Sequence, residues 1–508
     1  PDLASAHESP TGSTPVTGIG GTVLVHNGEF TYDNCDISFS TRVGALGVCR
    51  SYSDHSRWAT TDRSSLGPGW FLEWDENINV STQWIRWQTG DGQTVDFTGA
   101  GIGDSTERGH FFQLRRGNIL DHDNSPYYLV SPQGDETHFH VDGSLRFTRD
   151  RHGNRFDFQY NIRGELERVY DCMTRIRFFA FEYFHGSGAT PDPREGRLTK
   201  ITDYTNRRTI DLEYYTSPPN KAGLLREVKY PAVPTVVGGT VQSSRRPQTY
   251  DYWFDSGANV FRLETIKDAE NKTLIKNEFI QERVDKQSHE TSNLKWQFAY
   301  DATTRTTTVT DGEGNPTAYQ FPASPYPDGV APSNIVTTGH AGATFKYNRD
   351  GLLLEATYPD GNKALFRYQE FITGSSPLQL DNARSRANLL RSIEVATSGE
   401  ERVSSFSYDS GNRPLYSISP RGNSAGADPL INRVHYKWNS NTKTLENIFY
   451  PPVLNTSVHE LDPVVIATGT TSGHQSWYSV GWRSESFEYT PDGRVSKGTD
   501  KAGVVTNY

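Results

Sequence analysis

The stretch "FSYDSGNRPLYSISPRGN", residues 406–423, decides how the rest of the chain is read. Phe406 and Tyr408 alternate with polar residues, which is the period-2 pattern of a strand with one buried face. Asp409 to Asn412 form a turn, because Asp and Asn bond their own backbone and Gly adopts positive φ at no steric cost. Leu415 to Ile418 resume the alternation. The stretch therefore predicts a β-hairpin.

The same hairpin recurs along the chain. Paired turn glycines are 10, 10, 11 and 10 residues apart at 143 and 153, 351 and 361, 411 and 422, and 493 and 503. That is the spacing of strand–turn–strand–turn. Aromatic alternation recurs between such turns in "FDFQYN" (156–161), "FRYQ" (366–369) and "FEYT" (487–490). We predict structural turn roles for Asp142, Gly143, Asp350, Gly351, Asp409, Gly411, Asp492 and Gly493. A hairpin cannot bury its aromatic face alone, so the units are expected to stack.

The composition favours short strands and disfavours two classes of partner. The 508 residues include 45 Gly, 27 Pro and 12% aromatics, which suits a pleated sheet with many turns. With 51 Lys and Arg against 61 Asp and Glu, the formal net charge is −10. Nucleic acid and anionic membrane are poor general partners for such a surface. No apolar run approaches the roughly 20 residues that span a bilayer.

Two segments before the repeats carry a family resemblance. "NGEFTYDNCDISFSTRVGALGVCRSYSDHS" (27–56) is followed by "SLGPGWFLEWDENI" (65–78), which contains a Gly-Pro-Gly-Trp turn at 67–70. Together with the Tyr/Phe–Asp/Asn…Gly…Leu units, this order resembles the Rhs/YD-repeat proteins, the relatives of teneurin and of the shell subunits of insecticidal toxin complexes. The resemblance covers roughly residues 22–508.

The resemblance implies an all-β fold: a long ribbon of tandem hairpins that winds into a hollow spiral shell. In the family such a shell encloses a C-terminal toxin-like domain, which is released by self-cleavage near an Asp-Pro-x-Gly-Leu motif. That motif is missing, since the Asp-Pro pairs at 192, 428 and 462 lack it. The chain also stops inside a repeat, so we expect either a longer protein or a second chain that completes the shell.

The resulting prediction has three parts. Residues 1–21 form a flexible Ser/Thr/Pro leader left after trimming, 22–100 an N-terminal Rhs-type β region, and 101–508 the repeat shell, incomplete at its C-terminus. The expected function is a non-catalytic shell segment of a secreted or cell-surface polymorphic toxin, which encloses a cargo or assembles with another chain. The alternative is an extracellular adhesion or carbohydrate-binding scaffold. It would use Trp84, Trp87, Trp477 and Trp482 to bind a cell-surface glycan.

The three cysteines leave one question open. Cys35 and Cys49 flank a segment that can fold back near Gly44–Gly47, which would bring them face to face as a cross-strand disulfide in an oxidising compartment. Two buried thiols fit the sequence equally well, because free Cys packs as a small hydrophobe. Three scattered cysteines form no zinc motif.

Other chemical motifs are explained better without catalysis, and we expect no cofactor and no metal. Ser424 lies in "GNSAG", but Pro429 follows where a nucleophile elbow needs a helix. His138 and His140 are two residues apart on a predicted strand, and no third metal ligand is evident nearby.

Overall fold

The computed structural model describes residues 21–41, 44–54, 64–82, 84–98, 110–117, 125–186, 192–237, 240–245, 247–289, 294–322, 331–348, 350–369, 384–427, 432–451, 483–490 and 493–508. Within these residues the chain forms 38 strands and two short 3-10 helices, η2 (Pro219–Lys221) and η5 (Pro420–Asn423). The predicted all-β fold is confirmed. The segments 1–20 and 452–482 lie outside the described residues.

Two small sheets make up the N-terminal β region. One contains β1 (Gly21–Val23), β2 (Phe30–Thr41), β3 (Gly44–Ser53) and β4 (Trp70–Leu72) in that order. The other contains β5 (Asn77–Val80), β6 (Trp84–Gln88) and β7 (Thr94–Thr98).

The first part of the large sheet comprises β8 (Gln113–Arg116), β9 (Tyr127–Val130), β10 (Glu136–Phe139), β11 (Leu145–Arg149), β12 (Arg155–Tyr160), β13 (Leu166–Asp171), β14 (Arg177–Tyr183), β15 (Leu198–Asp203), β16 (Arg208–Tyr214) and β17 (Leu225–Lys229). The hairpin β18 (Val233–Val237) and β19 (Thr240–Ser244) forms its own two-stranded sheet, so β17 pairs directly with β20.

The sheet continues through β20 (Pro247–Asp255), β21 (Val260–Lys267), β22 (Thr273–Ile280), β23 (Arg283–His289), β24 (Leu294–Asp301), β25 (Thr306–Thr310), β26 (Pro316–Gln320), β27 (Asn334–Thr337), β28 (Ala343–Tyr347), β29 (Leu353–Thr357), β30 (Lys363–Tyr368), β31 (Leu389–Val395), β32 (Glu401–Tyr408), β33 (Pro414–Ile418), β34 (Arg433–Trp438), β35 (Leu445–Tyr450), β36 (Arg483–Tyr489), β37 (Val495–Thr499) and β38 (Val505–Asn507).

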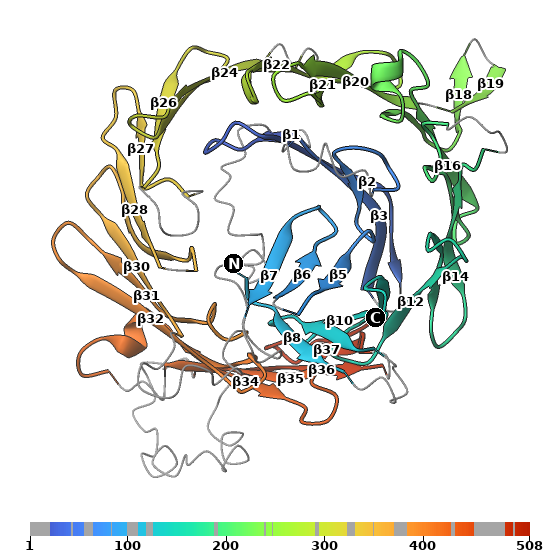
Figure 1. Ribbon diagram of the computed structural model, residues 1–508. Coiled ribbons are helices and arrows are strands. Elements are labelled where there is room, and N and C mark those ends of the chain that lie inside the picture. Colours follow the sequence, from blue (N-terminus) through green and yellow to red (C-terminus); the bar gives the residue numbers. More distant parts are fainter. Residues whose placement is uncertain are drawn as a thin grey trace.

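These strands form one antiparallel ribbon that curves around the N-terminal β region. Each strand pairs with its predecessor and its successor, and among the described residues β38 shares no register with β8. The ribbon is therefore an open sheet of 29 strands. Figure 1 shows it as a ring, with β1–β3 and β5–β7 lying inside the curve. The right-handed twist of successive strands is the physical source of such winding.

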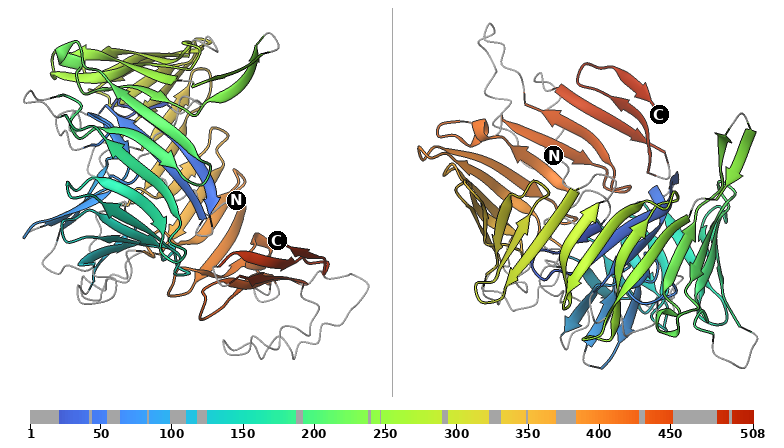
Figure 2. Two further views of the ribbon diagram at one scale, coloured as in Figure 1. Left: turned by 90° about the vertical axis from the view of Figure 1, so that its right-hand side faces the viewer. Right: turned by 90° about the horizontal axis from the view of Figure 1, so that it is seen from above.

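The ribbon meets itself after one revolution. The Arg384 guanidinium donates hydrogen bonds to the carbonyls of Ser131 at 2.7 Å and Pro132 at 3.1 Å. Farther along, Nδ1 of His152 lies 3.0 Å from the carbonyl of Thr442, a residue 290 positions away. Figure 2 shows the last strands, in orange and red, displaced along the ring axis from the teal strands near β10–β14. Successive revolutions thus touch through hairpin turns, not through paired strands.

Seven of the described hairpin turns repeat one backbone design. At Asp150 the backbone N–H of Gly153 donates to the Asp150 carbonyl, and Gly153 has a φ of 88°. One carboxylate oxygen of Asp150 accepts the N–H groups of His152 and Asn154, at 2.8 and 2.9 Å. The same side-chain acceptance occurs at Asn161, Asp268, Asp311, Asn348, Asp409 and Asp500. Positive φ at the third residue after the acceptor lets the next strand begin in register.

A tyrosine ladder links consecutive hairpins. The hydroxyl of Tyr183 donates to the Leu166 carbonyl, that of Tyr214 to the Leu198 carbonyl, and that of Tyr252 to the Leu225 carbonyl, at 2.7–2.9 Å. Each of these leucines is the cross-strand partner of the preceding ladder tyrosine, namely Tyr160, Tyr183 and Tyr214. The aromatic of each unit therefore satisfies a polar group of the unit before it while burying its own ring.

Candidate functional site

The predicted turn residues lie in hairpin turns, with one difference in mechanism. Gly143, Gly351 and Gly493 have φ values of 89°, 76° and 84°, as a left-handed position requires. In the turn of Asp409 and Gly411, however, the positive φ of 62° belongs to Asn412. Asp492 lies outside the described residues.

Two of the predicted turn aspartates have other partners. The Asp142 carboxylate accepts hydrogen bonds from the Ser144 hydroxyl and backbone N–H, at 2.6 and 3.0 Å, and the hydroxyl contact is the main cause that lowers its pKa. Asp350 forms an ion pair with Arg386 at 3.0 Å.

Apart from Asp409, sequence reasoning missed the residue that organises these seven turns. This is the Asp or Asn three positions before the positive-φ residue, as in Asp150 to Gly153 and Asn348 to Gly351. A second turn type places an Asp four positions before a non-glycine residue of positive φ, as in Asp203 to Arg207. Scanning for Asp or Asn at these two spacings would have found both types.

The residues considered for catalysis or metal binding contact neighbouring residues of the fold. The Ser424 hydroxyl donates to the Arg421 carbonyl at 2.6 Å, directly after η5. His138 stacks between Tyr128 and Phe147, with ring centroids 4.6 and 4.0 Å away, and His140 packs edge-on against Tyr160. Among the described residues no three His, Cys, Asp or Glu side chains converge as a metal site.

Cys35 and Cys49 face each other across β2 and β3 and are joined by a disulfide. Cys172 is a free thiol in a hairpin turn. The disulfide closes the hairpin that carries Asp36 and Arg50, which connect the N-terminal β region to the ribbon.

A buried ion pair lies at this connection, which we call the junction. The Arg50 guanidinium donates to both Asp36 carboxylate oxygens, at 2.5 and 2.7 Å, and both side chains are 0% exposed. Three neutral side chains add to the network: Arg50 donates to the Tyr250 hydroxyl at 3.1 Å, and the Tyr230 hydroxyl and the Asn34 amide donate to Asp36 at 2.8 and 2.6 Å. Buried charged groups are stable only when they are paired and hydrogen-bonded in this way.

Trp70 supplies the apolar part of the junction. Its side chain is fully buried, and its ring contacts Tyr32, Tyr52 and Tyr250 at centroid distances of 6.1, 5.2 and 4.8 Å. Its indole N–H donates to the Tyr252 hydroxyl at 2.9 Å. The Gly-Pro-Gly-Trp turn thus inserts an aromatic anchor into the inner face of the ribbon.

Two carboxyl groups in the loop after β4 carry raised pKa values. Burial raises the pKa of Asp75 to about 6, although the Leu72 N–H donates to its carboxyl at 3.0 Å. Burial likewise raises the pKa of Glu76 to about 8, against the effect of a hydrogen bond from the Trp87 indole N–H at 2.6 Å.

These two groups predict a pH dependence of stability. Their folded pKa values lie above the unfolded values of 3.8 and 4.5, so their contribution is complete below about pH 4 and is lost as pH rises through about 6 and 8. We expect urea unfolding, followed by tryptophan fluorescence, to show that these two groups make the N-terminal β region more stable at acidic than at alkaline pH, by on the order of a few kcal/mol. Asp75→Asn with Glu76→Gln should reduce this difference; an unchanged profile would contradict the assignment.

The inner face of the ribbon changes character along its length. In the first half the inward aromatics are buried, including Phe158 at 5% and Phe179 at 0% exposure, and both contact Trp74 of the N-terminal β region. The second half carries a half-exposed set that we call the inner aromatic face: Phe345, Tyr347, Phe366, Tyr368, Phe406, Tyr408, Phe487 and Tyr489. Residues that pair directly across two strands lie on the same face of a sheet. The successive pairs Tyr300–Thr307, Thr307–Tyr319, Tyr319–Ile335 and Ile335–Ala343 follow one face from the first half of the ribbon into the second. Both sets of aromatics therefore lie on the same face.

The tryptophans considered for glycan binding do not form one described platform. Trp87 is buried and packs edge-on against Phe112 at 4.8 Å. Trp84 is half-buried, with the Arg86 guanidinium 5.0 Å from its ring centroid. Trp477 and Trp482 lie outside the described residues. The described helices include none long and apolar enough to cross a membrane.

The fold defines a class of protein: an open, winding antiparallel ribbon with a small N-terminal β region docked on its inner face. Residues 20–97 match a domain family described as "Domain of unknown function (DUF6531)". This match nearly coincides with the N-terminal β region of the sequence prediction, residues 22–100. No curated protein matches the chain.

Several solved structures are similar to the chain. A TcdB2-TccC3-Cdc42 crystal structure is 11% identical with a TM-score of 0.41, covering 95% of this chain and 24% of that one. A TcdB2-TccC3 crystal structure is 11% identical with a TM-score of 0.40, covering 100% and 29%. A Photorhabdus luminescens Tc holotoxin pore is 13% identical with a TM-score of 0.40, covering 94% and 25%. The chain thus spans less than a third of the length of these structures.

Proposed function

We propose that this chain is a segment of an Rhs-type shell whose inner face encloses polypeptide. The observation that supports this is the change along the ribbon from fully buried to half-buried inward aromatics. Residues such as Phe158 and Phe179 are buried beneath the N-terminal β region, whereas Phe366 and Phe406 occupy the same face and are only half-buried. A concave surface of aromatic rings suits apolar and extended polypeptide, because flat rings contribute large contact areas at low entropic cost.

The enclosed polypeptide is either a downstream part of the same longer protein or a second chain. Among the described residues β38 pairs with β37 alone, so its other edge offers backbone N–H and C=O groups as a template for a further strand. We propose that the segment acts by containment, without a catalytic step of its own, and that it works outside the cell as part of a toxin-like assembly. The Cys35–Cys49 disulfide supports an oxidising compartment.

Site-specific photocrosslinking tests the enclosure. A benzoylphenylalanine at position 366 points to the inner face, whereas the same residue at position 367 replaces an exposed arginine on the opposite face of β30. In the full-length protein produced from its natural gene, we expect crosslinks to polypeptide outside residues 1–508 from position 366 and few from position 367. Equal crosslinking from both positions, or none from 366, would exclude enclosure by this surface.

A further inference from the structure

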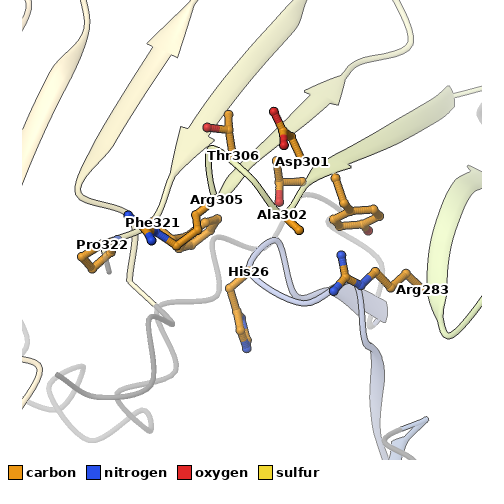
Figure 3. Close-up of a pocket in the computed structure, with 10 residues that line it drawn as sticks. His26, Arg283, Asp301, Ala302, Arg305, Thr306, Phe321 and Pro322 are labelled. Atoms are coloured by element: carbon orange, nitrogen blue, oxygen red, sulfur yellow. The ribbon is translucent and has the colours of Figure 1, made fainter. Parts of the chain in front are cut away.

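A cavity of about 410 Å³ lies where a turn of the N-terminal β region meets a hairpin turn of the ribbon (Figure 3). The turn between β1 and β2 contributes His26, β23 contributes Arg283, and the turn between β24 and β25 contributes Arg305. Phe321, just after β26, contributes an aromatic wall. Figure 3 shows Arg283 and Arg305 on opposite sides of His26.

The backbone around this cavity is held rigidly. The Val284 N–H donates to the Gly28 carbonyl at 2.9 Å, which ties the β1–β2 turn to β23. The contact is tight, because a Cβ on Gly28 would lie 2.7 Å from Cβ of Arg283 and from the Tyr300 ring. On the other side, the Phe321 N–H donates to the Arg305 carbonyl at 2.9 Å. Both arginines therefore extend from hydrogen-bonded backbone, and both are exposed.

The charges in the cavity are not balanced within the described residues. Among those residues neither the Arg283 nor the Arg305 guanidinium has an ion pair or hydrogen bond, and the Arg283 guanidinium lies 5.2 Å from the Tyr300 ring centroid. The single carboxylate among the described lining residues is Asp301, which accepts the N–H groups of Thr303 and Thr304 and the Thr304 hydroxyl. Figure 3 shows Asp301 pointing away from His26. Asp301 is thus committed to its own turn.

His26 adds an unsatisfied polar atom to this cationic cavity. Its Nδ1 is buried without a hydrogen-bond partner, and its ring packs edge-on against Phe321 at 6.4 Å. Burial lowers the pKa of His26 to about 4, so the ring is neutral at neutral pH and can donate one hydrogen bond from whichever nitrogen carries the proton. The described lining of the cavity thus offers two guanidinium groups and a neutral imidazole, while its one carboxylate, Asp301, is hydrogen-bonded within its own turn.

We propose that this cavity binds an acidic side chain of a polypeptide. Guanidinium forks match the two oxygens of a carboxylate and bind them with paired hydrogen bonds. The cavity volume of about 410 Å³ is more than ten times the roughly 30 Å³ of a water molecule. The cavity therefore has room for more than a small oxyanion. The Phe321 and Tyr300 rings and Pro322 provide apolar contact for the residues next to the carboxylate. The ligand is therefore a short segment with Glu or Asp beside an apolar residue, and this site does not depend on the proposed enclosure.

Calorimetric titration with two matched peptides tests the proposal on the unaltered protein. The probes are the acetylated amides of Gly-Leu-Glu-Phe-Gly and Gly-Leu-Gln-Phe-Gly, which differ by one charge. We expect the Glu peptide to bind about tenfold or more tightly than the Gln peptide, the usual scale of a charge-assisted contact. Inorganic phosphate and digalacturonate serve as the alternative oxyanions and are expected to bind more weakly.

Arginine variants localise the binding. Arg283→Gln and Arg305→Gln should each weaken the Glu peptide by about tenfold without affecting the Gln peptide. Arg402→Gln, an exposed position on β32, is the charge-matched control and should leave binding unchanged. Equal affinity for the two peptides, no detectable binding, unchanged affinity in both cavity variants, or phosphate or digalacturonate binding as tight as the peptide would overturn the proposal. The peptide comparison decides the matter even if a variant fails to fold.

Discussion

Replacing Arg50 with leucine should lower the free energy of unfolding by about 3–5 kcal/mol, because the change leaves Asp36 buried without its partner. Both side chains are 0% exposed, and the carboxylate would keep only the hydrogen bonds from neutral groups such as Tyr230. The N-terminal β region should also separate from the ribbon more readily. Denaturant unfolding gives the stability, and limited proteolysis of the N-terminal β region gives the detachment.

The same region offers a matched control for this loss. Arg86 and Asp96 form a two-pronged ion pair at 2.6 Å between β6 and β7, but their side chains are 46% and 32% exposed. Arg86→Gln should therefore cost about 0–1 kcal/mol. Replacing both buried partners, with Arg50→Leu and Asp36→Leu, should recover part of the loss because no unpaired charge remains. A cost for Arg50→Leu no larger than that of Arg86→Gln would mean that the junction does not hold the two parts together.

Gly143→Ala should destabilise the protein by about 3 kcal/mol or more, whereas Gly153→Ala should cost about 1–2 kcal/mol. Both glycines have nearly the same backbone conformation, with φ values of 89° and 88°, so the strain of a left-handed alanine is common to both. They differ in their surroundings. A Cβ on Gly143 would lie 1.9 Å from the Ile78 carbonyl oxygen, and one on Gly153 would meet nothing within 4 Å.

The difference between these variants measures how the ribbon docks on β5. The Ile78 N–H donates to the Gly143 carbonyl at 2.8 Å, and an isolated bridge joins Asn77 to Ser144. Backbone atoms surround the site, so the added methyl group cannot be accommodated by a side-chain rotation. Calorimetric melting of the two variants and of the unaltered protein provides the comparison. Equal costs would show that the turn at Gly143 does not press on the N-terminal β region.

Much of the ribbon follows from short-range sequence patterns. The hairpin at 406–423 forms as predicted, with Phe406 and Tyr408 in β32 and Leu415 to Ile418 in β33. The glycine spacing located the turns, but the acceptor three positions before the positive-φ residue was predicted at Asp409 alone, because the other predicted aspartates adjoin a glycine. In the turn that begins at Asp409, the residue with positive φ is Asn412 and not Gly411. Asn is one of the few non-glycine residue types that tolerate positive φ.

The candidate sites were beyond the reach of such patterns. Asp36 and Arg50 are ordinary charged residues in the sequence, and their importance arises because Tyr250 approaches from 200 positions away. The cavity between Arg283 and Arg305 likewise needs His26 from the other end of the chain. No local periodicity encodes contacts of this length.

The sequence by itself determined the units: strands of period 2, turns with Asp, Asn and Gly, and one aromatic face for each hairpin. These features are local because backbone sterics and side-chain to backbone hydrogen bonds act over a few residues. Only the tertiary structure decided which aromatics are covered, where the N-terminal β region docks, and that the ribbon meets itself at Arg384 and His152. Those outcomes depend on a small twist at each strand that accumulates over 29 strands, and no single hairpin specifies that sum.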